Sequence, residues 1–234
     1  MNTIGVVRWT RDGLRSKLKE FSELRKDRPI KNNFGGMRSP HMFIAWFAAQ
    51  FLKPKYIIES GVFKGQGTWF FEKASPDSEI HSIDPHLWQR EYISEKVIYH
   101  IEDFFHIDWS DISKEETLCF FDDHQDAVER VKFAQENGFK TLMFEDNYPP
   151  GQGDCYTLKQ AFAKGDEDAN YLRDILKVYY EFPPVFKMEK TRWGHKWDIY
   201  PTPKPLYESV EHHYLQVYFD EARWYTWMCY MELI

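Results

Sequence analysis

Cysteine and long apolar runs are both scarce in this sequence of 234 residues. Its three cysteines, Cys119, Cys155 and Cys229, are far apart and form no Cys-x-x-Cys pair, which argues against a cysteine-type zinc site and a disulfide framework. The N-terminal segment lacks the continuous apolar run of a signal peptide, and nothing approaches the ~18 apolar residues of a membrane span. We therefore expect a cytoplasmic protein with reduced thiols and no membrane contact.

Positive charge is also in deficit, with 30 Lys and Arg against 37 Asp and Glu. The net charge of −7 argues against a nonspecific nucleic-acid binder, which needs a basic face to neutralise phosphates, although a local basic patch stays open. A hydrophobic content of 43% is enough for a full core. The length suits one α/β domain over residues 1–234, with a helical extension at 1–39 and a variable cap region at 155–210.

Helical periodicity marks the N-terminal part of the chain. Residues 11–27 predict an amphipathic outer helix with its apolar side chains at Leu14, Leu18, Phe21 and Leu24. A loop containing Gly35 and Gly36 separates it from a mostly buried helix over 41–52. Ser39 is the candidate N-cap of that helix, with Pro40 at its first position.

Short apolar strands then alternate with helices. The strands are expected at 55–60, 79–84, 96–103, 117–123 and 140–146, with helices through 69–73 and 125–137. Such alternation predicts a parallel, doubly wound sheet with helices on both faces. Each of these strands ends in an acid, and the carboxyl ends of parallel strands are where such sheets bind ligands.

The C-terminal part has a different pattern. Residues 155–180 are expected to be helical. Residues 214–220 and 223–233 look like two strands joined by a short turn, which predicts an antiparallel pair at the sheet edge.

A glycine-rich turn follows the first strand in "YIIESGVFKGQGTWFF", residues 56–71. It suggests a nucleotide site, and one interpretation is the dinucleotide turn of short-chain dehydrogenases, which bind NAD(P). Those enzymes also need Tyr-x-x-x-Lys on a helix. The two such pairs here are poorly placed, because prolines interrupt 200–204 and because 92–96 comes too early in the sheet.

The other interpretation starts from Glu59, just before the turn. A carboxylate there prefers a cationic or hydroxyl-bearing ligand to a pyrophosphate, and the glycines let backbone approach closely. Asp84 ends the next strand, where an acid can hold a ribose through its hydroxyls. Acid, glycine turn and second acid together are the pattern that holds S-adenosylmethionine.

The segments "ESGVFKGQGT", "HSIDP", "FFDDH" and "MFEDNYP" occur in this order between residues 40 and 160. In this order they resemble class I S-adenosylmethionine-dependent methyltransferases, nearest to the metal-dependent sugar and macrolide O-methyltransferases and the cephalosporin-hydroxylase-like proteins. The resemblance implies a Rossmann-like methyltransferase sheet whose last strand is inverted. It also implies that cofactor contacts lie at Glu59, Gly61, Lys64 and Gly65 for the methionine end, Asp84 for the ribose, Glu102 or Asp103 for the adenine, and Asp122 as an alternative contact.

Four acids end the fourth and fifth strands: Asp122, Asp123, Glu145 and Asp146. Neighbouring strands lie ~4.8 Å apart, so these carboxylates would repel one another unless a cation compensates. Mg²⁺ suits oxygen ligands, and the resemblance implies that Asp122 or Asp123 binds it with the Glu145–Asp146 pair. Solvated or helix-capping acids are the alternative.

The resemblance further implies methyl transfer to a hydroxyl of a sugar or related small molecule. His124 is the candidate base, with Asp123 beside it as the other candidate catalytic residue, because imidazole titrates near neutrality. The related enzymes have Asp-Asp-Gly-Ser-His, whereas here His124 follows Asp123 directly, so another residue stays open as the base. The alternatives are His41, His86 and His106.

The loop after the second acid pair, "NYPPGQGDCY", is expected to cover the site, with Tyr148 against substrate and Asp154 capping the next helix. Candidate sugar-stacking aromatics are Trp193, Trp197 and Tyr200, and "RWGHKW" is a basic-aromatic patch that also suits a solvated hairpin.

The partner expected from this reading is a small-molecule or glycan acceptor, and its identity stays open. Homo-oligomer formation also stays open, with the first helix and the C-terminal strands as candidate contact surfaces. A protein that binds the cofactor without catalysis is the alternative from another class, favoured by the altered Asp-Asp-His segment.

Overall fold

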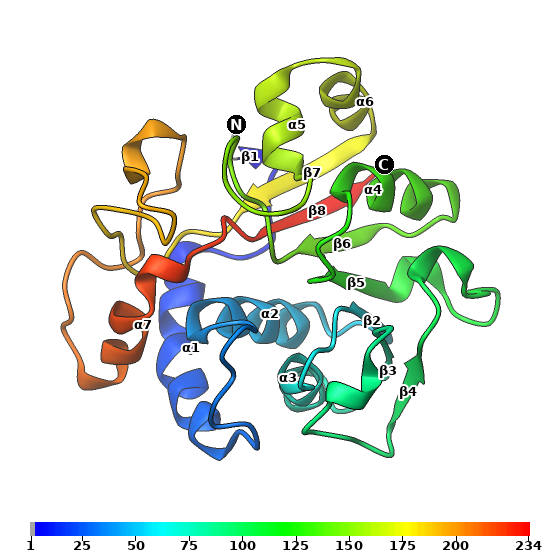
Figure 1. The fold of residues 1–234 in the computed structure, drawn as a ribbon, viewed down its shortest axis with the longest axis horizontal. Coiled ribbons are helices and arrows are strands. Elements are labelled where there is room, and N and C mark those ends of the chain that lie inside the picture. The colour runs from blue at the N-terminus through cyan, green and yellow to red at the C-terminus, as the bar shows by residue number, and fades with distance from the viewer. Residues whose placement is uncertain (1–2) are drawn as a thin grey trace.

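The computed structural model describes residues 3–234, apart from the side chain of Asp198. One sheet runs through the molecule and helices cover it on both sides (Figure 1). The strands are β1 (Thr3–Ile4), β2 (Tyr56–Ser60), β3 (Glu79–Ile83), β4 (Val97–His100), β5 (Thr117–Phe121), β6 (Thr141–Phe144), β7 (Leu176–Glu181) and β8 (Cys229–Leu233). The α-helices are α1 (Arg11–Leu24), α2 (Ser39–Leu52), α3 (Gln66–Ala74), α4 (Ala127–Glu136), α5 (Leu158–Lys164), α6 (Glu167–Ile175) and α7 (Gln216–Asp220).

The predicted fold class is confirmed by the sheet. Its strand order is β1-β7-β8-β6-β5-β2-β3-β4. The strands β2 to β6 pair in parallel, whereas β8 runs antiparallel to both β6 and β7. Because the parallel strands point the same way, the acids that follow them all reach one edge of the sheet.

Alternation along the strands produces a core on each face. Ile57 packs with the core that α1, α2 and α3 cover, while its neighbour Ile58 packs with the core under α4, α5 and α6. Figure 1 shows these two helical layers on opposite sides of the sheet. Strands buried on both faces read as continuous apolar runs, which is why their positions were predictable.

The C-terminal prediction is wrong in its details. Residues 214–220 form the end of a 3₁₀ turn and then α7 rather than a strand, and only Cys229–Leu233 of the last segment is extended. Residues 155–180 are helical only as far as Ile175, because the following β-branched and aromatic run forms β7. The partner of β8 is therefore β7, and the antiparallel strand β8 is interior rather than at the edge.

Two predicted helix caps are also wrong. Arg38 is the N-cap of α2 and Ser39 lies inside the helix, where its backbone N–H donates to Glu221 at 2.6 Å. A remote carboxylate thus replaces the local hydroxyl cap. Thr157, not Asp154, caps α5.

None of the helices among residues 3–234 is long and apolar enough to cross a membrane.

Candidate functional site

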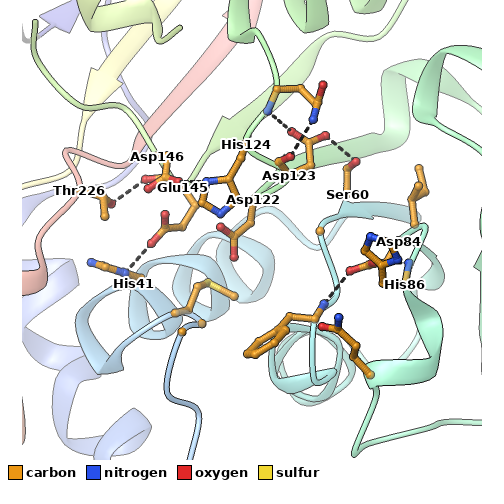
Figure 2. A pocket seen from close by; sticks show the side chains of 18 of the residues that line it. His41, Ser60, Asp84, His86, Asp122, Asp123, His124, Glu145, Asp146 and Thr226 are labelled. Carbon is orange, nitrogen blue, oxygen red and sulfur yellow. Dashed lines mark hydrogen bonds and ion pairs between the residues drawn. The ribbon is translucent and has the colours of Figure 1, made fainter. Parts of the chain in front are cut away.

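A cavity of about 600 Å³ opens at the carboxyl ends of the parallel strands. The loops that follow β2 to β6 each contribute to its lining, through Gly61, Asp84, Asp103, Asp122 and Asp146. Figure 2 shows Asp84 and His86 on one side of this space and Asp122, Glu145 and Asp146 on the other. The sequence predicted this edge of the sheet as the site, and the side chains do converge there.

The backbone of the glycine turn after β2 packs directly against the backbone of neighbouring loops. Gly61 has φ +98°, and a Cβ added there would lie 2.1 Å from the carbonyl oxygen of Asp122. Gly65 has φ +88° and would meet the carbonyl oxygen of Tyr92 at 2.6 Å. Glycine is required at both positions, because other residues rarely adopt this φ and their side chains would clash. Gly61 lines the cavity, whereas Gly65 begins α3 behind it.

Asp84 fixes the same turn from the next strand. Its Oδ2 accepts hydrogen bonds from the backbone N–H groups of Val62 at 3.0 Å and Phe63 at 2.8 Å, and its Oδ1 accepts from His86 N–H at 2.7 Å. Oδ1 keeps a further lone pair, so Asp84 can still accept from a ligand hydroxyl in the cavity that it lines.

Glu59 lies behind the cavity, not among its lining residues. Its side chain is fully buried and accepts hydrogen bonds from Thr68 Oγ1 at 2.5 Å and Ser82 Oγ at 2.7 Å. Burial raises the pKa of Glu59 to about 7 despite these donors. Its Oε1 has no hydrogen-bond partner among the described residues and would sit 2.3 Å from a Cβ at Gly67, so only glycine fits there.

Two other predicted cofactor contacts also lie outside the lining. Lys64 forms an ion pair with Glu91 at 2.6 Å and turns away from the cavity. Glu102 is exposed and does not line the cavity either. Asp103, in contrast, lines it while it receives both guanidinium N–H groups of Arg130, at 2.6 and 2.7 Å.

The acids after β5 and β6 form the negative floor of the cavity. Burial, followed by repulsion from Glu145 and Asp146, raises the pKa of Asp122 well above its ordinary value. The pKa of Glu145 is raised in the same way by burial and by Asp146. Asp146 is 8% exposed, and its Oδ2 forms no hydrogen bond within the described chain. This floor therefore holds more negative charge than its own contacts neutralise.

The four predicted metal ligands separate into two pairs. Asp122 and Asp146 come together with His124, with one ligand atom from each within 4.8 Å of the others. Asp123 instead accepts from Ser60 at 2.7 Å and pairs with Arg130 at 2.9 Å. Successive side chains near a strand end point to opposite sides, which separates Asp122 from Asp123.

Glu145 faces helix α2. Its Oε1 lies 2.5 Å from Nδ1 of His41, and both side chains are buried. Burial lowers the pKa of His41 to about 4, whereas burial and Asp146 raise the pKa of Glu145. The Glu145 carbonyl also accepts from Thr226 Oγ1 at 2.6 Å, which holds the segment before β8 against the floor.

His124 lies between the acidic floor and Asp154 of the loop that follows β6. Its Nδ1 lies 3.1 Å from Asp146 Oδ2 and 3.0 Å from Asp154 Oδ1. Burial alone would lower the pKa of His124, but Asp146 and Asp154 outweigh it and raise the pKa. Its φ is +56°, in the left-handed region that residues other than glycine rarely adopt. Of the alternative bases, His86 lines the cavity and His106 does not.

The aromatic residues proposed to stack on a sugar lie elsewhere. Trp197 is buried against Tyr225, with ring centroids 5.2 Å apart, and Tyr148 is also buried. Trp193 and Tyr200 do not line the cavity. The rim instead contains residues that the sequence did not single out, including Arg38 before α2 and Trp224 before β8.

The residues required by the dehydrogenase interpretation are not in place. Tyr92 lies in a loop and donates its hydroxyl to Glu72 at 2.6 Å. Tyr200 also lies outside any α-helix, and its hydroxyl donates to the Pro150 carbonyl at 2.7 Å. Neither tyrosine lines the cavity.

No family model and no curated protein matches this chain. Similar solved structures include cmcI-N160 SAH (19% identity, TM-score 0.46, 58% of this chain and 66% of that one) and cmcI-D160 Mg-SAM (18%, 0.46, 64% and 68%). Another is the O-methyltransferase TomG from Streptomyces achromogenes in complex with SAM (14%, 0.42, 59% and 73%). The matched part therefore spans just under two thirds to about three quarters of these proteins' lengths.

Strand order identifies the fold without these matches. Counted from β2, the parallel strands have the order 3-2-1-4-5, the arrangement of a doubly wound sheet. The last strand, β8, is inverted between β6 and β7. The fold is that of a class I methyltransferase.

The residues present fit a divalent cation and a nucleoside cofactor. Asp122 and Asp146 offer carboxylate oxygens, which hard cations prefer, and Asp146 Oδ2 is buried without a hydrogen-bond partner in the described chain. On the other side, the backbone at Gly61 leaves no room for a side chain, and Asp84 presents a carboxylate beside it.

Proposed function

We propose that this protein is an S-adenosylmethionine-dependent O-methyltransferase that acts, with a divalent cation, on a hydroxyl of a sugar or related small molecule. The observation that carries this proposal is that two groups of residues face each other across one cavity. One group is the Gly61 turn with Asp84, and the other is the oxygen-rich floor of Asp122 and Asp146.

In this proposal Asp84 accepts hydrogen bonds from the ribose, and Asp122 and Asp146 hold the cation. When bound, S-adenosylmethionine would supply an electrophilic methyl group, and a divalent cation held by Asp122 and Asp146 would lower the pKa of an acceptor hydroxyl. His124 accepts the proton from that hydroxyl, and its carboxylate neighbours strengthen it as a base. Holding both substrates in line inside one cavity supplies much of the acceleration.

The remaining acids position this machinery. Arg130 ties Asp123 and Asp103 together, which fixes the loops after β5 and β4 on the cavity side. His41 contacts Glu145 at 2.5 Å, so in this proposal Glu145 acts through charge and position rather than as a ligand. This assignment differs from the one the sequence suggested, in which all four acids were ligand candidates.

A cofactor-binding protein without catalysis is the second candidate. The observation that favours it is His124, which has an unusual backbone conformation and shares its Nδ1 between Asp146 and exposed Asp154. In that case His124 completes a cation site and no base serves the acceptor.

Binding and transfer are tested separately. Calorimetry with S-adenosylhomocysteine and with NADP⁺ is expected to show binding of the former only. Transfer of an isotope-labelled methyl group to a glycan and polyol panel is then measured with Mg²⁺ and with EDTA. We expect transfer that EDTA abolishes and that Asp146→Asn lowers at least about 100-fold, since a metal supplies several kcal/mol to the transition state.

The exposed Asp111→Asn change is the matched control for that substitution and leaves transfer unchanged. Tight binding of S-adenosylhomocysteine with no transfer to any acceptor would favour the second candidate. NADP⁺ binding in place of S-adenosylhomocysteine would overturn the proposal.

A further inference from the structure

Two arginines and an indole form part of the cavity rim. Arg38 comes from the loop before α2, Arg192 from the segment between β7 and α7, and Trp224 from the segment before β8. The guanidinium carbons of Arg38 and Arg192 lie 4.9 and 5.5 Å from the Trp224 ring centroid. Segments far apart in sequence thus place two positive charges on one aromatic ring.

Among residues 3–234, neither of these arginines forms an ion pair or a side-chain hydrogen bond. Arg130, the third arginine of the cavity, differs because its guanidinium donates to both Asp103 and Asp123. Guanidinium N–H groups form a planar fork that suits carboxylate and phosphate oxygens. Arg38 and Arg192 therefore keep this capacity for a ligand in the cavity.

Acids and arginines line the same cavity. Asp122 and Asp146 contribute carboxylates to its lining, and Arg38 and Arg192 contribute guanidinium groups. A ligand that complements both kinds of side chain carries hydroxyl groups together with an anionic group.

We propose that the acceptor is an anionic sugar whose carboxylate or phosphate is bound by Arg38 and Arg192 beside Trp224. This inference rests on the proposed function and specifies its acceptor. A hydroxyl of the same sugar then points to the floor, where His124 and the acids lie. The anion also fixes which hydroxyl is presented, because the arginines and the acids then hold the sugar at two points.

The test is calorimetric titration of the protein saturated with S-adenosylhomocysteine and Mg²⁺. The probes are three methyl glycosides that differ at one carbon: a hexose, the corresponding hexuronic acid and the hexose 6-phosphate. We expect at least about tenfold tighter binding of one anionic glycoside than of the neutral one, since a charge-assisted hydrogen bond contributes more than the equivalent of one decade. The carboxylate and phosphate arms distinguish the two anions.

Arg38→Gln and Arg192→Gln are each expected to remove most of this preference. Arg223→Gln is the matched control, because Arg223 also stacks on Trp224, at 5.1 Å, but does not line the cavity. It should leave the preference unchanged. Thermal unfolding of all three variants checks that they remain folded.

The anion could instead be the carboxylate of the cofactor's methionine end. Affinity for S-adenosylhomocysteine is therefore measured in each variant, and we expect changes below about twofold. A loss of S-adenosylhomocysteine affinity equal to the loss of glycoside affinity would overturn the inference, as would equal binding of neutral and anionic glycosides. Repeating the titration without S-adenosylhomocysteine keeps the anion preference measurable even if the cofactor proposal fails.

Discussion

Neighbouring acids in this protein have different roles. Asp122 and Asp146 face the cavity, whereas Asp123 pairs with Arg130 and Glu145 contacts His41. Asp122 and Asp123 are adjacent in sequence, as are Glu145 and Asp146. Their different roles therefore come from the direction of each side chain and from the residues that it contacts. Side-chain direction, rather than the sequence motif, thus decides which acid of each pair is the ligand candidate.

A single residue, Glu59, makes the stability of the protein depend on pH. Its ordinary pKa of 4.5 applies to the unfolded chain, and burial raises the pKa in the folded protein to about 7. The folded state keeps a proton that the unfolded state loses in this window, so the Glu59 contribution to stability falls as pH rises from 4.5 to about 7. Glu59→Gln removes this loss.

At pH 8 we expect Glu59→Gln to be more stable than the parent by up to roughly 3 kcal/mol, and near pH 4.5 the difference should vanish. Chemical denaturation at both pH values measures it. Glu102→Gln, at an exposed acid, is the control and should show no such dependence. A constant difference at both pH values would show that Glu59 is ionised in the folded state.

At the scale of elements, the turn after β2 and the loop after β5 are built against each other. A Cβ at Gly61 would meet the Asp122 carbonyl at 2.1 Å, and φ there is +98°. We expect Gly61→Ala to destabilise the protein by about 2–5 kcal/mol, from backbone strain plus overpacking, and to abolish S-adenosylhomocysteine binding.

Gly138→Ala is the matched change for Gly61→Ala. Gly138 has a similar φ of +84°, but nothing lies within 4 Å of an added Cβ. Its cost is the strain alone, about 1–2 kcal/mol. Denaturation of both variants measures their losses of stability, and calorimetry measures their cofactor binding. Equal losses of stability would contradict a steric clash between the Cβ at position 61 and the Asp122 carbonyl.

Helix α4 holds two loops of the site through Arg130. The side chain is 1% exposed and pairs with Asp103 and Asp123. Arg130→Met leaves these carboxylates without their cation, and we expect a loss of about 3 kcal/mol, measured by denaturation. Arg173→Met, on the exposed face of α6, should cost little. A small loss for Arg130→Met would mean that water replaces the guanidinium easily.

At the scale of the whole molecule, we expect the acidic floor to couple folding to cation binding. A cation that binds only the folded protein adds about 2.7 kcal/mol at 100 times its Kd. For a chain of this size, that corresponds to a Tm increase of about 5–10 °C. We expect differential scanning calorimetry with Mg²⁺ to show this increase and EDTA to reverse it.

Asp146→Asn tests the physical cause of the Mg²⁺ effect. Removing one charge relieves the repulsion within the floor, so we expect a higher Tm without metal and little response to Mg²⁺. The exposed Asp111→Asn change should alter neither quantity. A Tm that rises with Mg²⁺ equally in both variants would place the cation elsewhere.

The sequence by itself determined the parallel core of the molecule and the edge that bears the site. Strands buried on both faces must be apolar throughout, and the residues that follow them reach one edge, so Gly61, Asp84, Asp122 and Asp146 were identifiable. It misjudged residues 214–220 and the end of 155–180, because short aromatic segments suit a strand or a helix until packing decides.

Only the tertiary structure decided which of the named residues share the cavity. Glu59 and Lys64 belong to the right motif, yet one is buried behind the turn and the other pairs with Glu91. Arg38, Arg192 and Trp224 come from distant segments with no common motif, and only folding brings them together. Local pattern fixes where an element lies, whereas the direction and partner of each side chain depend on contacts between residues far apart in the chain.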